Sequence, residues 1–491
     1  MKKSSRLYVI GAGFAGRSLV GQIREKAVLG EVVAFLDDDP AKIGQNLDGI
    51  PVLGPIREVA CLLRTKSGDE AIIAIPSAGL EYLRGLYRIL KKAGFEKIRI
   101  LPGIPQIIEG DARLVQTRSI SVQDLLGRIP VDIALKQSLA YLRGRRVLVT
   151  GAGGSVGGEL CRQLLSAGVH RLYLFGHGEN SIYEIDRELR LLQEGGVGER
   201  TDLVPVIGEI KDGDYLKHVV GRLRAEVIFH AAAYKHVPIM EENAVAAIEN
   251  NVLGTRNLLL AAGLHGTERL VHVSTDKAVD PVSVYGASKL ICERLVLEAG
   301  FMAVRFGNVL GSRGSVVPLF QRQIEGGGPV TVTDPGMRRW FMTIPEACSL
   351  VLKSGGSGEN GNLYLLDMGE PVPIRELAEK MIRFYGFEPE RDIRIEYSGM
   401  RPGERLDERL WSRDEIPRET EHPRILRLER KEASRIDLEA LLARLEPVCR
   451  YDRQNPESYR NEALLRSILR EAIPELDLDA GRVPPKGKES P

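Results

Sequence analysis

Cysteine is scarce in this chain, and its spacing supports neither disulfides nor a zinc site. Five cysteines occur among 491 residues, without Cys-x-x-Cys spacing, at Cys61, Cys161, Cys292, Cys348 and Cys449. An odd, scattered set excludes a disulfide framework and favours buried apolar thiols in a reducing compartment. The eight histidines show no metal-ligand spacing either, so we interpret His230 and His236 as structural and expect no metal.

Long apolar runs and a charge excess are also absent. The chain begins Met-Lys-Lys-Ser-Ser and has no run of about 18 consecutive apolar residues, so we expect neither a signal peptide nor a membrane span. The net charge of +1 gives no electrostatic reason to expect nucleic acid or an anionic membrane as a partner. These absences predict a cytoplasmic protein that recognises anions only through local sites.

The composition is that of a globular α/β protein. With 43% hydrophobic residues, 27% charged residues and 52 glycines in 491 residues, the chain can bury an ample core and predicts two or three domains. The order of its segments predicts two Rossmann-like, doubly wound parallel sheets in tandem, the second with a smaller C-terminal substrate-binding lobe.

The first predicted domain, residues 1–118, opens with a strand, a glycine turn and a helix. An apolar run ends at Ile10, and Gly11, Gly13 and Gly16 then form a dinucleotide-type turn. A second strand pattern ends at Asp37, where a carboxylate would meet a ribose hydroxyl. This pattern predicts a second nucleotide site, and the alternative is a fold that binds no dinucleotide and keeps its glycines for packing.

Residues 119–144 lack strand and helix alternation and are predicted to be a connector. A new strand at 146–150 then leads into a G-x-x-G-x-x-G turn and an amphipathic helix, the dinucleotide turn of short-chain dehydrogenases. We therefore predict a nicotinamide cofactor, NAD or NADP, bound by Gly151, Gly154, Ser155, Val156 and Gly157. We also expect cofactor contacts from Ala231 and Ala232, which follow a predicted strand.

The rest of the second domain, 145–430, alternates strands with helix-length segments. The strands are predicted at 171–175, 204–207, 227–230, 270–274 and 302–305. After about residue 306 the alternation loosens, as in a substrate lobe. Residues 431–491 are predicted to be a C-terminal helical segment with a disordered polar tail.

The residues that carry chemistry lie between 274 and 289. Tyr285 and Lys289 share one helix face, so the ammonium favours a phenolate that can take a proton from a sugar hydroxyl as hydride leaves its carbon. Thr275, Asp276 and Lys277 precede them at the carboxyl end of a strand, where ligands bind in open α/β sheets.

The Asp-Lys pair points to elimination of water. Once carbon 4 of a hexose is a ketone, a neutral Lys277 can remove the carbon 5 proton while Asp276 protonates the carbon 6 hydroxyl. A simple epimerase has no need of such a pair. A solvated salt bridge between the two side chains is the alternative interpretation.

Six segments resemble the bacterial polysaccharide-biosynthesis UDP-N-acetylglucosamine 4,6-dehydratases, extended short-chain dehydrogenases/reductases. The segments span residues 147–157, 230–238, 274–279, 305–316, 339–347 and 401–406, and include Ser-Thr-Asp-Lys-Ala-Val and Arg-Pro-Gly-Glu-Arg-Leu. The preceding Rossmann-like domain is similar to the long form of that family, without its usual leading membrane helices. The resemblance implies diphosphate contacts from Asn308, Arg339 and Arg401. Arg313 in the glycine-rich loop is a further candidate for substrate binding, and Lys235 follows a strand's carboxyl end, where it would face substrate or cofactor; ordinary loop cations are the alternative for both.

Two departures from the family pattern leave the chemistry open in detail. Gly176-His177 stands where many members have an acid after the second strand, so the choice between NAD and NADP is open. Tyr285 stands where long members often have Met, which leaves retention or inversion at carbon 5 open. The sequence thus predicts a homo-oligomeric dehydratase acting on a UDP-sugar, with a UDP-sugar 4-epimerase or a non-catalytic nucleotide sensor as alternatives.

Overall fold

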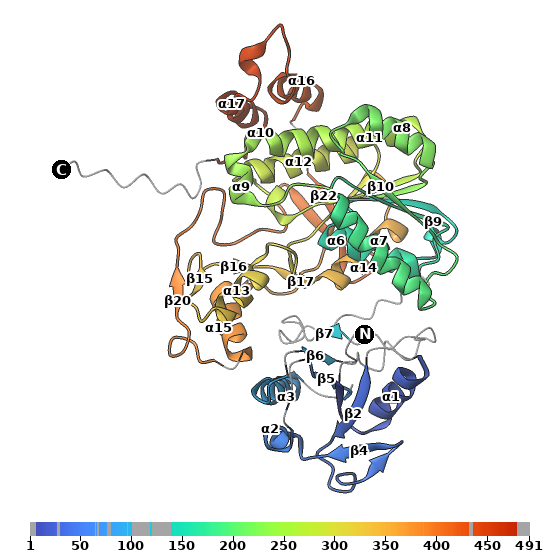
Figure 1. The fold of residues 1–491 in the computed structure, drawn as a ribbon. Coiled ribbons are helices and arrows are strands. Elements are labelled where there is room, and N and C mark those ends of the chain that lie inside the picture. The colour runs from blue at the N-terminus through green and yellow to red at the C-terminus, as the bar shows by residue number, and fades with distance from the viewer. Residues whose placement is uncertain are drawn as a thin grey trace, which may run out of the picture. The chain divides into compact units, whose positions relative to one another are not determined.

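A computed structural model of the chain shows an α/β architecture with two compact units (Figure 1). It describes residues 6–26, 30–63, 65, 68–75, 80–95, 97–100, 118–119, 139–385, 387–431 and 436–478. The N-terminal unit comprises 1–132 with 379–394, and the C-terminal unit comprises 133–378 with 395–491. The boundaries of the four predicted segments stay predictions, and most of the predicted connector and the whole predicted tail lie outside the described residues.

The N-terminal unit is built around a sheet in the order β3-β4-β2-β1-β5-β6-β7, parallel from β4 to β6. Its apolar core contains Leu7, Val9, Phe35 and Ile72, all from the central strands. The elements are β1 Arg6–Ile10, α1 Phe14–Lys26, β2 Glu31–Leu36, β3 Asn46–Leu47, β4 Ile50–Leu53, α2 Val59–Leu62, β5 Glu70–Ile73, α3 Leu80–Lys92, β6 Lys97–Ile100 and β7 Arg118–Ser119.

The C-terminal unit is built around a longer sheet in the order β10-β9-β8-β11-β12-β13-β18-β22-β21. From β10 to β18 all pairs are parallel, and the order around β8 is the Rossmann order with its switch point between β8 and β11. The strands are β8 Arg146–Thr150, β9 Arg171–Gly176, β10 Asp202–Ile207, β11 Val227–His230, β12 Arg269–Val273, β13 Met302–Arg305, β18 Leu363–Leu366, β21 Glu415–Glu419 and β22 Ile425–Arg430.

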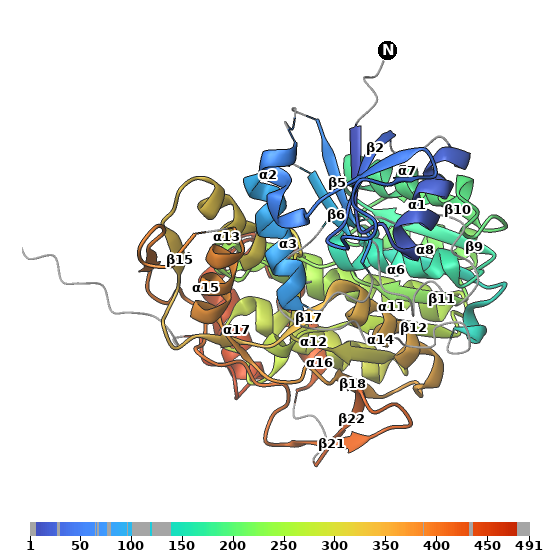
Figure 2. The same ribbon diagram turned by 90° about the horizontal axis from the view of Figure 1, so that it is seen from below.

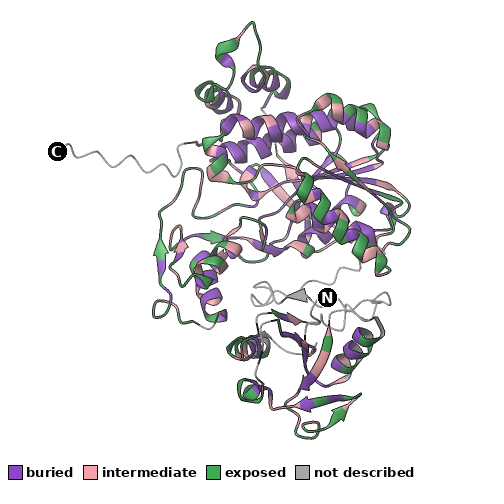
Figure 3. Ribbon diagram, in the orientation of Figure 1, coloured by how far each residue is buried: buried purple, intermediate pink, exposed green. Residues whose placement is uncertain are grey.

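Helices cover both faces of this sheet. In Figure 1, α8, α11 and α12 lie above it and α6, α7 and α14 lie below it. Buried residues fill the inner strands β8, β11, β13 and β18 and almost all of α12 (Figure 3), as expected for a parallel sheet enclosed on both sides. The helices are α6 Ser155–Ser166, α7 Glu179–Glu194, α8 Gly213–Leu223, α11 Gly254–Leu264, α12 Val284–Glu298 and α14 Ile344–Ser357.

A smaller set of elements follows β13, as the sequence predicted. Three short two-stranded pairs form there, β14 with β17, β15 with β20 and β16 with β19. Within the C-terminal unit, α13 and β15 lie on the side away from β9 and β10 (Figure 2). The bounds are β14 Asn308–Leu310, α13 Val316–Glu325, β15 Val330–Val332, β16 Arg338–Arg339, β17 Phe341–Thr343, β19 Val372–Pro373, β20 Ile395–Tyr397, α16 Leu438–Cys449 and α17 Glu462–Ala472, while α15 Ile374–Phe384 crosses the division between the units.

The predicted fold class is confirmed by these topologies. The predicted strands at 171–175, 204–207, 227–230, 270–274 and 302–305 correspond to β9 to β13. The antiparallel pair β21 and β22 was not predicted, because Pro417 and alternating charged residues make both strands look like loop. Proline is tolerated in β21 because that strand is at the sheet edge.

Candidate active site

The glycine turn between β8 and α6 is packed too closely for side chains. Gly151 has a φ of +72°, and a Cβ there would lie 2.8 Å from the backbone nitrogen of Ala232. A Cβ on Gly157 would lie 2.1 Å from the carbonyl oxygen of Gly151. The first turn of α6 is therefore pressed against the ends of β8 and β11, the backbone cradle that a pyrophosphate requires. The predicted residues Gly151, Gly157 and Ala232 are brought together here.

The loop after β14 lies against this turn. The backbone N–H of Arg313 donates to Ser155 Oγ at 3.1 Å, and its guanidinium donates to the carbonyl oxygen of Gly153. Lys235 Nζ donates to the carbonyl oxygen of Arg313 at 2.9 Å. The structure thus places Arg313 and Lys235 beside the cofactor turn, and their predicted contact with substrate stays a prediction.

Lys289 is held at the carboxyl end of β12. Its Nζ donates to the carbonyl oxygen of Val273 at 2.7 Å and lies 2.8 Å from His272 Nε2. Burial, together with the Lys289 ammonium and His230, keeps the pKa of His272 well below 6.5, so its neutral ring accepts this proton. His272 was not recognised in the sequence, because a histidine inside a strand pattern carries no distinguishing signal.

Tyr285 lies one turn before Lys289, at the start of α12. Ser283 caps this helix by accepting from the backbone N–H of Gly286 at 3.0 Å, which fixes where the helix begins. Burial raises the pKa of Tyr285 to about 12, even though the Lys277 ammonium and a hydrogen bond with Thr275 act to lower it. The phenol is therefore protonated at neutral pH in this state and stands beside both predicted sets of catalytic groups.

Asp276 and Lys277 form a short 3-10 turn directly after β12. Lys277 Nζ donates to Asp276 Oδ1 at 3.0 Å and to Asn308 Oδ1 at 3.2 Å, and Thr275 Oγ1 donates to the same aspartate oxygen. Asp276 is fully buried and its Oδ2 has no hydrogen-bond partner in the described part of the chain. A Cβ on Gly307 would lie 3.1 Å from that oxygen and 2.9 Å from Cβ of Trp340, so glycine is needed there for close packing against Asp276.

Glu408 is a member of this cluster that sequence reasoning missed. Its Oε1 lies 3.7 Å from Lys277 Nζ and 3.7 Å from Arg339 Nε. Burial lowers the pKa of Lys277, but the carboxylates of Asp276 and Glu408 overcome this effect and hold the net pKa above the usual value for lysine. In this state Lys277 is an ammonium rather than the neutral base that the sequence suggested.

Two of the predicted diphosphate ligands are engaged elsewhere in this structure. The guanidinium of Arg339 donates to the carbonyl oxygens of Arg338, Arg405 and Leu406. Arg401 is exposed and pairs with Glu404 at 2.6 Å. Asn308 and Arg339 therefore both belong to the cluster around Lys277, whereas Arg401 pairs within its own loop. The diphosphate-binding roles of all three residues stay predictions.

The glycine turn of the N-terminal unit is also tightly built. A Cβ on Gly16 would lie 2.0 Å from the carbonyl oxygen of Gly11, whereas one on Gly13 would meet nothing within 4 Å. Asp37 follows β2 as predicted, but its carboxylate accepts from the backbone N–H groups of Ala12 at 2.7 Å and Asp39 at 2.9 Å. The aspartate thus stabilises its own turn, and a nucleotide site here stays a prediction.

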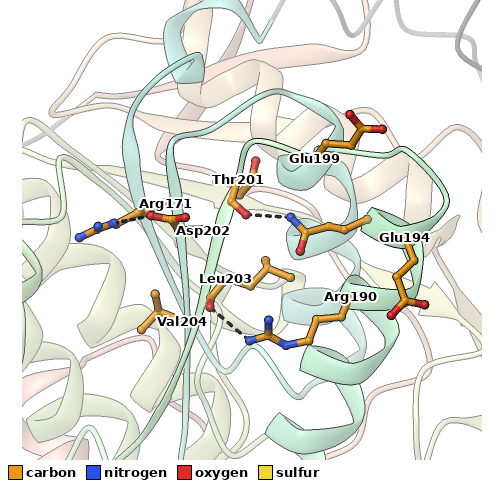
Figure 4. Close-up of a pocket in the computed structure, with 9 residues that line it drawn as sticks. Arg171, Arg190, Glu194, Glu199, Thr201, Asp202, Leu203 and Val204 are labelled. Atoms are coloured by element: carbon orange, nitrogen blue, oxygen red, sulfur yellow. Dashed lines mark hydrogen bonds and ion pairs between the residues drawn. The ribbon is translucent and has the colours of Figure 1, made fainter.

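A depression of about 720 Å³ lies at the other end of the large sheet (Figure 4). It is lined at the first residues of β9 and β10, where Arg171 pairs with Asp202 at 3.0 Å, and on α7 by Arg190. Ligands in open α/β sheets bind at the carboxyl ends of strands. This depression is therefore not the active site.

The part of the chain that the structure describes contains no cluster of three or more His, Cys, Asp or Glu side chains placed to hold a metal ion. No helix within the described ranges is long and apolar enough to cross a membrane. The glycine turn after β8 fits a nicotinamide dinucleotide, since it brings the backbone of the turn and of α6 close together. In this state Lys289 is bound to the carbonyl oxygen of Val273, so its predicted pairing with Tyr285 stays a prediction.

The strand order and the glycine cradle define a dinucleotide-binding fold of the short-chain dehydrogenase/reductase type. A family model described as "Polysaccharide biosynthesis protein" matches residues 147–430, and the chain belongs to that family. The predicted family is thus confirmed.

Three relatives show how far the similarity extends. The chain is 42% identical over 429 residues to "Probable polysaccharide biosynthesis protein EpsC" of Bacillus subtilis, covering 86% of this chain and 71% of the relative. It is 30% identical over 282 residues to a "UDP-N-acetylglucosamine 4,6-dehydratase (inverting)" of Campylobacter jejuni, covering 55% and 79%. It is also 30% identical over 285 residues to a "UDP-glucose 4-epimerase" of Rickettsia rickettsii, again covering 55% and 79%. The chain is therefore dehydratase- or epimerase-like, and similarity alone does not choose between the two.

Proposed function

We propose that the protein is a UDP-N-acetylglucosamine 4,6-dehydratase, or acts on a close relative of that sugar nucleotide, in the cytoplasm. The observation that carries the proposal is the Asp276–Lys277 pair, 3.0 Å apart, next to Tyr285 at the carboxyl end of β12. Oxidation at carbon 4 needs only the tyrosine and lysine pair. A second acid and base beside it are needed when water is eliminated.

The residues take separate roles in the proposed reaction. A bound nicotinamide, NAD or NADP, would supply the redox chemistry, taking up a hydride from carbon 4 and later delivering it to carbon 6. Tyr285 is protonated in this state and has to become a phenolate before it can accept the proton of the carbon 4 hydroxyl. Lys289, one turn further along α12, is the cation that we assign to support that phenolate. Asp276 has a free Oδ2 for the carbon 6 hydroxyl, and Lys277 accepts the carbon 5 proton.

Lys277 has to lose a proton before it acts as this base. The carboxylates of Asp276 and Glu408 oppose that loss by raising the pKa of Lys277 above the ordinary lysine value. If Asp276 carries a proton, as the acid role demands, one of the two negative charges disappears and the ammonium becomes more acidic. The acid and base roles are therefore coupled, because protonating one partner helps to deprotonate the other.

The test is direct. The purified protein is incubated with UDP-N-acetylglucosamine in heavy water, and the product is analysed by mass spectrometry. A dehydratase gives a product lighter by one water, with deuterium at carbon 5. A product of unchanged mass that is the 4-epimer supports the alternative, a UDP-sugar 4-epimerase, and rejects the dehydratase.

The cofactor provides a second test that is independent of turnover. Oxidation and reduction cancel within one reaction cycle, so we expect nicotinamide to copurify with the protein. Denaturation and chromatography should release about one NAD(H) or NADP(H) per chain, and a second equivalent only if the N-terminal glycine turn binds as well. A protein that contains none and cannot bind any would exclude both the dehydratase and the epimerase.

A further inference from the structure

Lys277 faces two carboxylates from distant parts of the chain. Asp276 is its neighbour in sequence, whereas Glu408 comes from the segment before β21 and lies 3.7 Å from Lys277 Nζ. The Glu408 side chain is 7% exposed. Burying a carboxylate costs folding free energy unless the group is paired. The position of Glu408 next to the largely buried Lys277 therefore calls for an explanation.

The structure fixes Glu408 firmly. Its backbone carbonyl accepts from Trp340 Nε1 at 2.9 Å. Arg339 lies beside it with Nε at 3.7 Å from Oε1 and uses its other guanidinium nitrogens on the carbonyl oxygens of Arg405 and Leu406. Arg339 therefore holds residues 405–408 in place by these hydrogen bonds. Glu408 then lies between two cations, Lys277 and Arg339.

The neighbouring side chains of Arg338 and Asp407 form the same kind of pair at the surface. Arg338 binds Asp407 through two hydrogen bonds, at 2.8 and 3.1 Å, and both side chains are about half exposed. Adjacent residues thus make one exposed pair and one buried pair. The exposed pair is a matched internal control for the buried one.

We propose that Glu408 is a positioning residue that holds the Nζ of Lys277 in place and governs its charge state during catalysis. This inference rests on the proposed function, in which Lys277 must shed and regain a proton. The charged and titratable groups that face Lys277 are Asp276, Glu408, Arg339 and Tyr285. Among them Glu408 is a fixed negative charge whose partner, Arg339, is not consumed by the reaction.

The sign of the effect follows from the charges. Glu408 raises the pKa of Lys277 and Arg339 lowers it. A neutral glutamine at position 408 keeps the shape but removes the raising effect, so Lys277 should lose its proton at lower pH. Each pKa unit corresponds to a tenfold larger neutral fraction at a fixed alkaline pH. A charge at this distance changes a pKa by about one unit in bulk water and by about three units at the dielectric near a protein surface, so an increase of at least about tenfold is expected.

The experiment measures the reactivity of Lys277 itself. Wild-type protein, Glu408→Gln, Glu408→Asp and the control Asp407→Asn are treated briefly with acetic anhydride across a range of alkaline pH. Peptide mass spectrometry gives the acetylation rate of Lys277, normalised to the half-exposed Lys217. Only the neutral amine reacts, so the rate follows the deprotonated fraction.

We expect acetylation of Lys277 to be at least roughly tenfold faster in Glu408→Gln and within about twofold of wild type in Asp407→Asn. Glu408→Asp keeps the charge and should stay close to wild type. If the aspartate variant reacts as fast as the glutamine variant, the change is one of access rather than charge, and the inference is wrong. An unchanged rate in Glu408→Gln also overturns it.

The catalytic readout separates this inference from the proposed function. In Glu408→Gln the rising limb of dehydration against pH should move to lower pH, with a lower maximal rate because Lys277 is less well held. One outcome is that the wild type releases no water from the substrate, although Lys277 is acetylated faster in Glu408→Gln. In that case the control of the Lys277 charge by Glu408 is supported and the dehydratase is rejected. If wild type dehydrates and Glu408→Gln shows neither shift, the dehydratase stands and the role of Glu408 is rejected.

Discussion

Replacing Arg305 with leucine should strongly destabilise the C-terminal unit. Arg305 is 1% exposed and donates to Glu293 at 3.0 and 2.7 Å and to Glu415 at 2.7 and 3.1 Å, as well as to the carbonyl oxygen of Leu410. Without it, two carboxylates that are 0% and 3% exposed lose their main partner. Breaking a buried ion pair in this way costs about 3–5 kcal/mol, and the nearby Arg294 places the value toward the lower end.

The assay can report on this unit alone. Both tryptophans, Trp340 and Trp411, lie in the C-terminal unit, so fluorescence during urea unfolding follows it selectively. Arg338→Leu removes a bidentate arginine that is about half exposed, and it should cost at most about 1 kcal/mol. A triple variant with leucine at 293, 305 and 415 should recover part of the loss, since no buried carboxylate is then left without its partner. The recovery should be incomplete, because Arg294 and Arg430 lose their acidic neighbours.

The pH dependence gives the result that would refute the reasoning. In the wild type, burial raises the pKa of Glu293, but Arg305 overcomes this effect and the net pKa lies below 4.5. The ion pair therefore stabilises the fold above pH 4.5, and this stabilisation is lost as the pH falls through the lowered pKa. In Arg305→Leu burial dominates, the pKa rises, and falling pH relieves the penalty. The loss should therefore be smaller at about pH 5.5 than at about pH 7.5. A loss below about 1 kcal/mol, or one independent of pH, would contradict a charge-based account.

Three further predictions concern the site. Gly157→Ala should abolish nicotinamide copurification, because the new Cβ would lie 2.1 Å from a backbone oxygen. The adjacent Gly158→Ala, whose Cβ would have no contact nearer than 3.4 Å, should retain the nicotinamide in the same chromatographic measurement. Lys277→Ala should still oxidise carbon 4, seen as bound reduced nicotinamide by absorbance, yet fall roughly 10²- to 10⁴-fold in water loss, while Tyr285→Phe should fail at the oxidation itself. Arg401→Ala should raise KM more than it lowers kcat in steady-state kinetics, by about 2 kcal/mol of binding, and an unchanged KM would leave Arg401 as a loop residue.

The fold was predictable wherever the signal is local. The strand ending at Thr150, the glycine turn and the helix that follows are consecutive in sequence, and each glycine is required by a contact within a few residues or one neighbouring strand. Tyr285 and Lys289 were predictable for the same reason, since a spacing of four places both on one face of a helix. Local spacing therefore predicted the glycine turn after β8 and the helix that carries Tyr285 and Lys289.

The rest of the site depends on contacts between residues far apart in the chain. Glu408 reaches Lys277 only because Arg339 and Trp340 hold its segment, and nothing in Asp407-Glu408-Arg409 distinguishes the buried acid from its exposed neighbour. The roles of Arg339 and Arg401 could not be separated either, because both are arginines in family motifs and only the folded chain shows which one is buried. Residues 379–394 group with the N-terminal unit, a division that no composition shift in the sequence marks.

The charged side chains around Lys277 alternate in sign, which would allow the proposed proton transfers without a change in net charge. Asp276, Lys277, Glu408 and Arg339 form a chain of alternating sign that sums to zero, and all four are largely buried. A proton that moves from Asp276 to a leaving hydroxyl, together with one that moves from carbon 5 to Lys277, restores the same alternation at the end of the step. Because the sum does not change, the surroundings need little reorganisation, and this is the property expected of a preorganised site for elimination. The same balance explains why a second carboxylate is needed. With Asp276 protonated and Lys277 neutral, as the proposed elimination requires, Glu408 is the negative charge that pairs with Arg339 and keeps the sum at zero.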